Sequence, residues 1–260
     1  MRDIQIEKII DIAREAGKEI MTVYAQDFTV ETKGDNSPLT LADQKSNAVI
    51  IKALKELYPD IPIISEETKL TPYEERKNWK MYWLVDPLDG TKEFIKKNGE
   101  FTVNIALMSE GRPVLGVVYA PAKNLLWYGM EGSGSFMMNG DGSKTPLKKG
   151  SNWRDLQKVN VVASRSHLSD ETLQFVEDLK KEGKEVDFVS SGSSLKFCLV
   201  AEGKADVYPR FGPTMEWDTA AGQAVIEIAG GSVLNWETKK RLEYNKENLL
   251  NPFFIVEFTA

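Results

Sequence analysis

The sequence predicts an α+β to α/β molecule built in layers, in two parts that meet near residue 150. Before that point, two helical stretches precede β-like runs separated by Gly, Pro or Lys, a pattern typical of antiparallel hairpins. After it, strand-like and helical segments alternate, as in a layered α/β unit. A chain of 260 residues is long enough for one or two domains. The sequence contains neither an internal repeat nor a low-complexity linker, so we expect residues 1–150 and 151–260 to pack together.

Apolar side chains that recur every three to four residues identify two helices in the first part. They cover residues 3–25 and residues 41–57, where Tyr58-Pro59 ends the pattern. Short β-like runs then predict strands at residues 61–64, 81–85, 101–108, 113–119 and 124–130. Residues 132–149 are rich in Gly and Lys, and we expect them to form loops around one short strand.

The second part contains shorter elements that change type along the chain. Strands are predicted at residues 158–163, 186–189, 206–208 and near 253–258, and helices over residues 171–181, 194–201 and 219–229. The Gly230-Gly231 pair ends the last of these helices.

The charge balance excludes a general nucleic-acid-binding protein. Lys and Arg number 33 against 39 Asp and Glu, so the formal net charge is −6, whereas a nucleic-acid polymer requires a basic surface. The single cysteine, Cys198, cannot form an internal disulfide, which favours a cytoplasmic setting. No apolar run approaches the roughly 20 residues that span a bilayer. We therefore expect neither a signal peptide nor an integral membrane segment, while association with a membrane surface stays open.

Carboxylates follow two predicted strands at the point where each strand ends. Glu66 and Glu67 come after residues 61–64, although a solvated turn also carries such a pair. Three apolar residues lead directly into Asp86, so its carboxylate is expected to lie partly buried. Because an unpaired buried charge is costly, the position of Asp86 implies a cation nearby.

The turn after Asp86 supplies further oxygen atoms. Pro87 fixes the direction of the chain there. Asp86 and Asp89, three residues apart on a tight turn, can face one point together with the carbonyl group of Leu88. Hard oxygen ligands of this kind suit Mg²⁺, whereas a zinc site would need a Cys/His set, and this chain has one histidine, His167.

Two predicted helix starts adjoin these acids. Gly90 and Thr91 begin a short helical segment whose free N–H groups suit a phosphate. The alternative is that Asp89 is only an N-cap, which is worth about 1 kcal/mol. Trp217-Asp218 opens another helix, and the small residues after it allow close packing that brings Asp218 toward the other acids. A plain N-cap is the alternative for Asp218 as well.

Three separated motifs resemble those of the inositol monophosphatase superfamily of Li⁺-sensitive, Mg²⁺-dependent phosphomonoesterases. The family pattern is a Glu-Glu pair, then Asp-Pro-(Ile/Leu)-Asp-Gly-Thr, then Trp-Asp far downstream. This sequence matches the pattern at Glu66-Glu67, at residues 86–91 and at Trp217-Asp218. Residues 37–43 are similar to the family's Thr-x-x-Asp helix entry. The resemblance covers nearly the whole chain and implies a sandwich of alternating αβαβα layers.

The resemblance assigns roles that the residues alone leave open. It implies that two or three Mg²⁺ ions are held by Glu66, Asp86, Asp89, Asp218 and the carbonyl group of Leu88. Asp86 would bridge two ions, and Glu67 would orient a water molecule. Thr91, hydrogen-bonded to Asp43, resembles the family pair that takes the proton of the attacking water. Without the resemblance, Asp43 would be interpreted as a surface acid on a helix.

Within the superfamily, the second part is similar to the CysQ-type 3′(2′),5′-bisphosphate nucleotidases. The matching stretches are residues 164–167, 192–198 and 206–222. The similarity implies hydrolysis of adenosine 3′,5′-bisphosphate to AMP and phosphate by a metal-activated water, with the sulfated precursor as a second substrate. The implied substrate contacts are Gly90, Thr91, His167, Ser193, Lys196 and Arg210.

Several alternatives remain open at this point. An inositol phosphatase or a sugar bisphosphatase of the same superfamily would share the metal site and differ in its substrate. A non-catalytic metal- or phosphate-binding module would keep the fold, although the complete set of acids argues against it. Lys196 and Arg210 are compatible with a solvated surface, and His167 with a structural histidine. The sequence also leaves the oligomeric state open.

Overall fold

The computed structural model describes residues 4–26, 38–163 and 169–259, which form two β-sheets and the helices around them. One sheet comprises β1 (Ile63–Ser65), β2 (Met81–Asp89), β3 (Thr102–Ser109), β4 (Arg112–Ala120), β5 (Leu125–Met130), β6 (Gly134–Met138) and β7 (Lys144–Pro146). The other comprises β8 (Lys158–Ala163), β9 (Glu185–Ser190), β10 (Val207–Arg210), β11 (Ser232–Asn235) and β12 (Phe254–Glu257). The first sheet follows chain order, and the second has the order β11-β12-β10-β8-β9.

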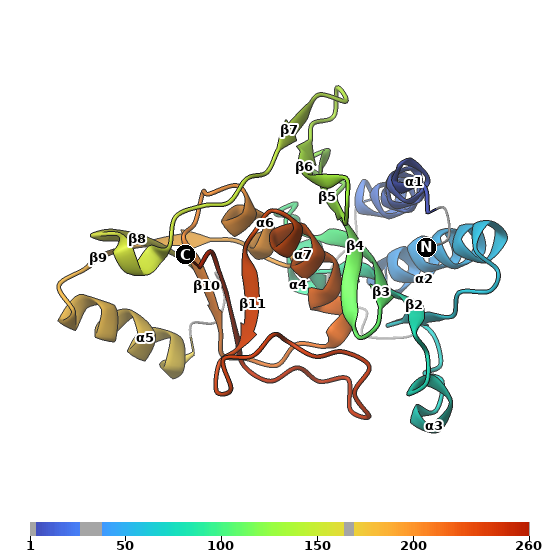
Figure 1. The fold of residues 1–260 in the computed structure, drawn as a ribbon. Helices are drawn as coiled ribbons and strands as arrows, with labels where there is room; N and C mark the ends of the chain where they lie inside the picture. The colour runs from blue at the N-terminus through green and yellow to red at the C-terminus, as the bar shows by residue number, and fades with distance from the viewer. Residues whose placement is uncertain (1–3, 27–37, 164–168, 260) are drawn as a thin grey trace.

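Helices and sheets alternate in five layers (Figure 1). The outer helices are α1 (Ile6–Tyr24) and α2 (Pro38–Leu57) on the first sheet and α5 (Asp170–Lys181) on the second, while α6 (Leu195–Ala201) and α7 (Glu216–Ile228) lie between the sheets. Two short helices, α3 (Tyr73–Arg76) and α4 (Thr91–Ile95), follow β1 and β2 respectively. This arrangement confirms the αβαβα sandwich that the family resemblance implies.

The first helical layer forms as its apolar spacing predicts. Ile9, Ala13 and Ile20 recur on one face of α1 and have no exposed surface. They belong to a hydrophobic cluster shared with α2 and the first sheet, including Val117 of β4. Burying each large aliphatic side chain contributes about 1.5–3 kcal/mol, so this face fixes α1 on the sheet.

The strands from β2 to β7 are antiparallel neighbours, as the hairpin prediction requires. Glu110 and Gly111 join β3 to β4 with φ angles of 49° and 76°. Two successive residues with positive φ match the right-handed twist of a hairpin, and glycine adopts this conformation at little cost.

The structure differs from the sequence prediction in several places, including the starts of α2 and α7, which each lie three residues earlier than predicted. β2 continues past Val85 to Asp89, and its pairing with β3 is irregular between Asp86 and Asp89, because Pro87 has no N–H group to donate. Residues 132–149 contain two strands, β6 and β7, rather than one. The sequence predicts neither α3 nor β11, since three of the four residues of α3 are charged and only two of the four residues of β11 are apolar.

Small residues bring α7 close to its neighbours. A Cβ atom on Gly116 of β4 would lie 2.3 Å from the carbonyl oxygen of Ala221 in α7. A Cβ atom on Gly222 would lie 2.6 Å from Phe197 Cγ in α6. Side chains at either position would push α7 outward, so these glycines allow its first turn to lie beside the end of β2.

The division into two domains near residue 150 stays a prediction. The first sheet ends at Pro146 and the second begins at Lys158. However, α7 comes after the division and packs on β3, β4 and β5. The two parts of the chain therefore share the central helical layer.

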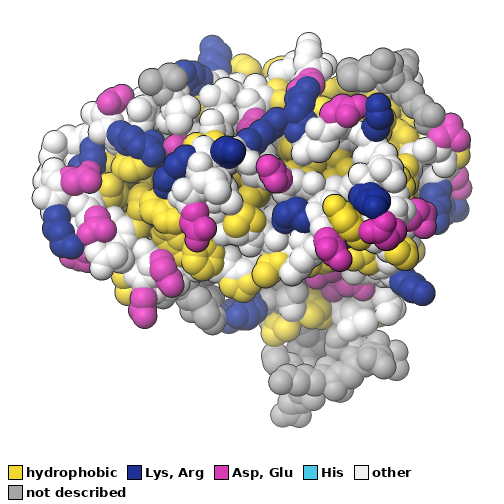
Figure 2. All heavy atoms as spheres, turned by 60° about the horizontal axis from the view of Figure 1, so that its bottom comes forward, with side chains coloured by type: hydrophobic (Ala, Val, Ile, Leu, Met, Phe, Trp, Pro, Cys, Tyr) yellow, Lys and Arg dark blue, Asp and Glu magenta, His cyan; other side chains and the backbone are white. Residues whose placement is uncertain are grey.

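Charges of both signs are interspersed on the face shown in Figure 2. Lys and Arg side chains alternate there with Asp and Glu, and hydrophobic side chains lie between them. This face of the described residues therefore has no broad basic area of the kind that binds nucleic-acid polymers. Among the described helices, none combines the length and the apolar character that crossing a bilayer requires.

Candidate active site

Three carboxylates from separate parts of the chain meet beside the end of β2. Glu66 follows β1, Asp86 lies within β2, and Asp218 lies in the first turn of α7. One carboxylate oxygen from each residue lies within 4.8 Å of the others. The fold thus brings together three acids that the sequence separates by more than half of the chain.

Asp86 is the most deeply buried of the three, with 1% of its surface exposed. Its Oδ1 accepts a hydrogen bond from the Leu88 N–H group at 3.0 Å. The carbonyl oxygen of Pro87 accepts one from the Ser46 hydroxyl of α2 at 2.8 Å, which fixes the turn. Burial, followed by the charges of Asp89 and other acids, raises the pKa of Asp86 well above its usual range.

Asp218 is bonded to the backbone just before α7. Its Oδ2 accepts a hydrogen bond from the Met215 N–H group at 2.9 Å, and Met215 is the N-cap residue. Burial, followed by the charge of Asp89, raises the pKa of Asp218 to about 8. Asp218 is therefore not the N-cap itself but the third residue of the helix in a capping box with Met215. Asp89 is not an N-cap either, because the N-cap of α4 is Gly90.

Two buried side chains that the sequence analysis missed orient Asp89. The Ser194 hydroxyl donates to Asp89 Oδ2 at 2.9 Å and lies 2.8 Å from the carbonyl oxygen of Asp218. Asn104 Nδ2 donates to Ser194 Oγ at 2.9 Å and lies 3.5 Å from Asp89 Oδ2. Asn104 carries a signal that would have identified it, since it is a polar residue inside an apolar strand. Ser194 carries none, because serine is common at helix starts.

Asp43 faces the same acids from α2 and is 9% exposed, so it is not the surface acid of the alternative interpretation. Burial, followed by the charges of Glu67 and Glu66, raises the pKa of Asp43 to about 8. Within the described residues, no hydrogen bond joins Asp43 to Thr91, which is exposed at the start of α4. The catalytic roles of Asp43, Thr91 and Glu67 stay predictions.

A cavity of about 630 Å³ opens beside the acids. The residues that line it include Asp89, Gly90, Ser193, Lys196, Tyr208, Arg210, Phe211 and Asp218. Acidic, cationic and aromatic side chains therefore share one cavity, in which the chain brings together most of the substrate contacts that the sequence predicts.

Lys196 reaches the cavity from α6 although only 6% of its surface is exposed. Its Nζ donates to the carbonyl oxygen of Ser193 at 2.6 Å and lies 5.6 Å from the centre of the Tyr208 ring. Burial lowers the pKa of Lys196 to about 8, although the nearby charge of Asp89 acts to raise it. Lys196 is therefore not a solvated lysine, and a buried cation at a cavity suits an anionic ligand.

The other predicted contacts differ in their placement. Gly90 has a φ of 100°, and a Cβ atom there would lie 3.2 Å from Ser193 Cβ, so glycine lets the two cavity walls approach. Arg210, at the end of β10, donates to the carbonyl oxygen of Pro213 at 3.0 Å. His167 lies outside the described residues, so its contact stays a prediction.

The acidic cluster fits a hard divalent cation. The charges that act on Asp86 all belong to other carboxylates: Asp89, Glu66, Asp218 and Asp43. Such groups repel one another when ionised, and each is ordinarily ionised at neutral pH. Several carboxylate oxygens around one point are the ligands that Mg²⁺ and Ca²⁺ prefer.

The sequence model of the inositol monophosphatase family matches residues 4–252. The chain belongs to the inositol monophosphatase family. Among its relatives in this family, the 3′(2′),5′-bisphosphate nucleotidase CysQ of Salmonella typhimurium is 49% identical over 254 residues, which cover 96% of this chain and 98% of that protein. The protein of the same name from Escherichia coli K12 is 48% identical, with the same coverage.

Solved structures of the family have the same fold. The crystal structure of CysQ from Bacteroides thetaiotaomicron superposes with a TM-score of 0.89 at 45% identity and covers 99% of both chains. The IMPase of Thermotoga maritima has a TM-score of 0.74 at 25% identity, covering 97% of this chain and 91% of its own. Enzymes of this family use divalent metals, and the carboxylate cluster of this chain is a suitable place for them.

Without a divalent cation, ionised acids in the cluster are expected to destabilise the fold. The pKa of Asp43 rises from 3.8 to about 8 on folding, so its contribution to stability decreases as the pH rises between these values. Asp43→Asn should therefore raise the Tm in EDTA more at pH 8 than at pH 5, by about 2–4 °C for each kcal/mol gained. Asp11→Asn, on the exposed face of α1, is the control. Equal Tm changes at both pH values would contradict this electrostatic account.

Proposed function

We propose that the chain hydrolyses adenosine 3′,5′-bisphosphate to AMP and inorganic phosphate. The observation that carries the proposal is that one cavity is lined by two acids, Asp89 and Asp218, and also by two cations, Lys196 and Arg210. A nucleoside bisphosphate has two phosphate groups, so it needs one positive centre for the phosphate that is cleaved and another for the phosphate that is retained. The sulfated precursor, which also carries two anionic groups on one nucleoside, is a proposed second substrate.

We assign Mg²⁺, in two or three ions, to the acidic cluster. The residues that would hold it are Glu66, Asp86, Asp89, Asp218 and the carbonyl group of Leu88. When bound, the ions lower the pKa of a coordinated water and neutralise charge on the phosphate oxygens. The chain itself buries Asp86 away from solvent and orients Asp89 through the hydrogen bond from Ser194.

Asp43, together with Thr91, is the proton acceptor in this proposal. The raised pKa of Asp43, about 8, is close to the working pH, where a general base is most effective. Glu67 lies beside it and would orient the water molecule. Binding of a divalent cation nearby will lower the pKa of Asp43 from this raised value.

The retained phosphate is assigned to Lys196, Arg210 and Ser193. The aromatic rings of Tyr208 and Phe211, which line the same cavity, provide flat apolar surface for a nucleoside base. Gly90 and Thr91 at the start of α4, and His167, complete the proposed substrate contacts.

The relatives support this substrate over an inositol phosphate. The Salmonella typhimurium and Escherichia coli proteins, at 49% and 48% identity over nearly their whole length, are named as 3′(2′),5′-bisphosphate nucleotidases. The relative from Thermotoga maritima that is named as an IMPase is 25% identical. A cytoplasmic location is also part of the proposal. The single cysteine, Cys198, is buried and unpaired, which is typical of proteins in a reducing compartment.

Phosphate release from adenosine 3′,5′-bisphosphate and from inositol 1-phosphate, measured with and without Mg²⁺, tests the proposal. We expect Mg²⁺-dependent, Li⁺-sensitive release, with a kcat/KM for the nucleotide at least about tenfold higher, because only the nucleotide engages both halves of the cavity. A preference for inositol 1-phosphate would reassign the substrate, and release from neither compound would overturn the enzymatic function.

Lys196→Met should raise the KM for adenosine 3′,5′-bisphosphate by roughly 10–100-fold with a smaller change in kcat, because it removes a charged partner of the retained phosphate. Lys204→Met, an exposed lysine after α6, is the matched control. The pKa of Lys196, about 8, further predicts that kcat/KM decreases above that pH as its positive charge is lost. Lys196→Arg should remove this alkaline decrease. A loss confined to kcat would contradict the assigned role.

A further inference from the structure

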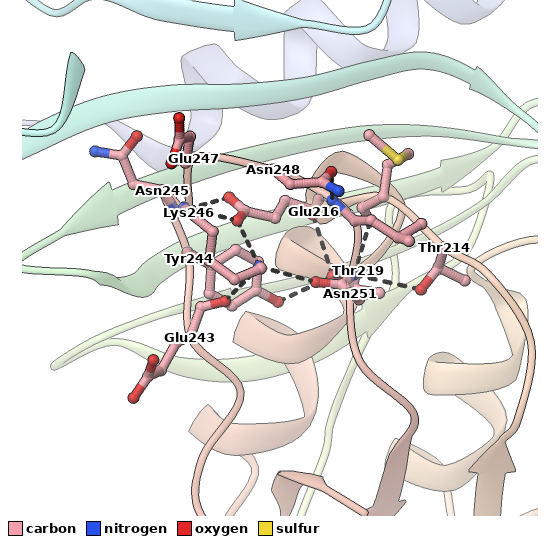
Figure 3. Close-up of polar contacts among 12 residues, drawn as sticks. Thr214, Glu216, Thr219, Glu243, Tyr244, Asn245, Lys246, Glu247, Asn248 and Asn251 are labelled. Carbon is pink, nitrogen blue, oxygen red and sulfur yellow. Dashed lines mark hydrogen bonds and ion pairs between the residues drawn. The ribbon is translucent and has the colours of Figure 1, made fainter. Parts of the chain in front are cut away.

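A buried polar network joins the start of α7 to the chain around residues 243–251 (Figure 3). Asp218 lies in the first turn of α7, two residues after Glu216. Glu216 is the first residue of α7 and has no exposed surface. Its carboxylate accepts hydrogen bonds from the N–H groups of Asn245 (2.7 Å) and Lys246 (3.1 Å), and Lys246 Nζ lies 2.5 Å from it. The chain at residues 243–251, here named the clasp segment, thus folds onto the first turn of α7.

Asn251, at the end of the clasp segment, binds the backbone on the other side of Glu216. Its buried Nδ2 donates to the carbonyl oxygen of Met215 at 2.9 Å and to the Thr219 hydroxyl at 3.1 Å. Its N–H group donates to the carbonyl oxygen of Thr214 at 2.8 Å. The turn that carries Asp218 is therefore bonded to the clasp segment before and after that residue.

Arg76 joins the clasp segment to the part of the chain that carries Glu66. Its side chain is 1% exposed, and its Nη1 donates to Asn245 Oδ1 at 2.7 Å. Asn245 Nδ2 donates back to the carbonyl oxygen of Arg76 at 2.7 Å. Arg76 ends α3, the first helix after Glu66, so one network connects the segments that carry Glu66 and Asp218.

Stability alone does not account for this network. Burying the charged groups of Arg76 and Glu216 carries a desolvation cost that apolar side chains of similar size would not incur. In the described part of the chain, Arg76 Nε and the Tyr82 hydroxyl are moreover buried without a hydrogen-bond partner. A hydrogen-bonded network of this kind fixes one geometry, which an apolar contact specifies less sharply.

We propose that Asn245 and Glu216 are positioning residues that set the distance between Asp218 and Glu66, and thereby the affinity of the acidic cluster for a divalent cation. This inference rests on the proposed function, because it takes both carboxylates as metal ligands. One oxygen of each carboxylate lies within 4.8 Å of the other, and like charges at this spacing repel, so a restraint from outside the cluster is needed to keep them at ligand spacing. The clasp segment provides that restraint through α7.

Asn245→Gly tests the proposal with little change to the backbone. Asn245 has a φ of 62°, which glycine adopts freely, so the variant keeps the N–H group that binds Glu216 and loses both bonds to Arg76. Mg²⁺ binding, measured by calorimetry without substrate, should weaken roughly tenfold, the lower end of the loss that follows removal of outer-shell groups at metal sites. At saturating Mg²⁺, the KM for adenosine 3′,5′-bisphosphate should match that of the unsubstituted chain.

Lys239→Gly is the matched control, because Lys239 has a φ of 58° and lies on the exposed turn after β11. It should bind Mg²⁺ like the unsubstituted chain. A lower Tm of Asn245→Gly with unchanged Mg²⁺ affinity would make the clasp segment purely structural and overturn the inference. If the unsubstituted chain itself binds no Mg²⁺, the proposed function fails instead.

Lys246→Met is a second variant, which tests the same proposal if Asn245→Gly does not fold. The Lys246 side chain is 27% exposed, so this change leaves the core intact while removing the charge that pairs with Glu216. The expected result is again weaker Mg²⁺ binding, measured well below the Tm, with an unchanged KM for the nucleotide. Unchanged Mg²⁺ binding by a folded Lys246→Met variant would overturn the inference.

Discussion

Repulsion among the carboxylates of the acidic cluster opposes folding, and every layer of the structure acts against it. Asp86, Glu66, Asp218 and Asp43 converge at the end of β2, and burial together with their neighbours raises the pKa of each. Unfolded, these groups would ionise near pH 4 and lie apart. The fold must therefore hold them together against their own charge, and a divalent cation is the ligand that removes the repulsion.

Each layer of the sandwich contributes one restraint on this cluster. The first sheet places Glu66 and Asp86 side by side, because β1 and β2 are parallel and pair Ser65 with Val85. The central layer brings α7 close, since Gly116 leaves room for its backbone. The same layer supplies Ser194, which lies within hydrogen-bond distance of both Asp89 and Asp218. The cavity is built by the same elements, so Asp89, Asp218 and Lys196 face one space.

Much of the fold was predictable because its long elements have clear periods. The spacing of Ile9, Ala13 and Ile20 predicts α1, and glycines between β-like runs, such as Gly111, predict the turns of the hairpins. The short elements α3 and β11 were not, because α3 is mostly charged and β11 has only two apolar residues. At the site, the order of the motifs identified the acids and the family. The sequence does not show which distant residues come into contact. Nothing in it connects Arg76 with Asn245, which are hydrogen-bonded only because the fold brings them together.

Calorimetric titration of the metal-free chain with Mg²⁺ in two buffers of different ionisation enthalpy measures whether the acidic cluster exchanges its protons for a cation. Raised carboxyl pKa values mean that the cluster holds protons near neutral pH, and a metal ligand must lose its proton to bind. We expect saturable binding at pH 7 with release of protons, a smaller proton release at pH 9, and little binding by Asp86→Asn. Saturable binding without proton release, or equal binding by Asp86→Asn, would contradict this expectation.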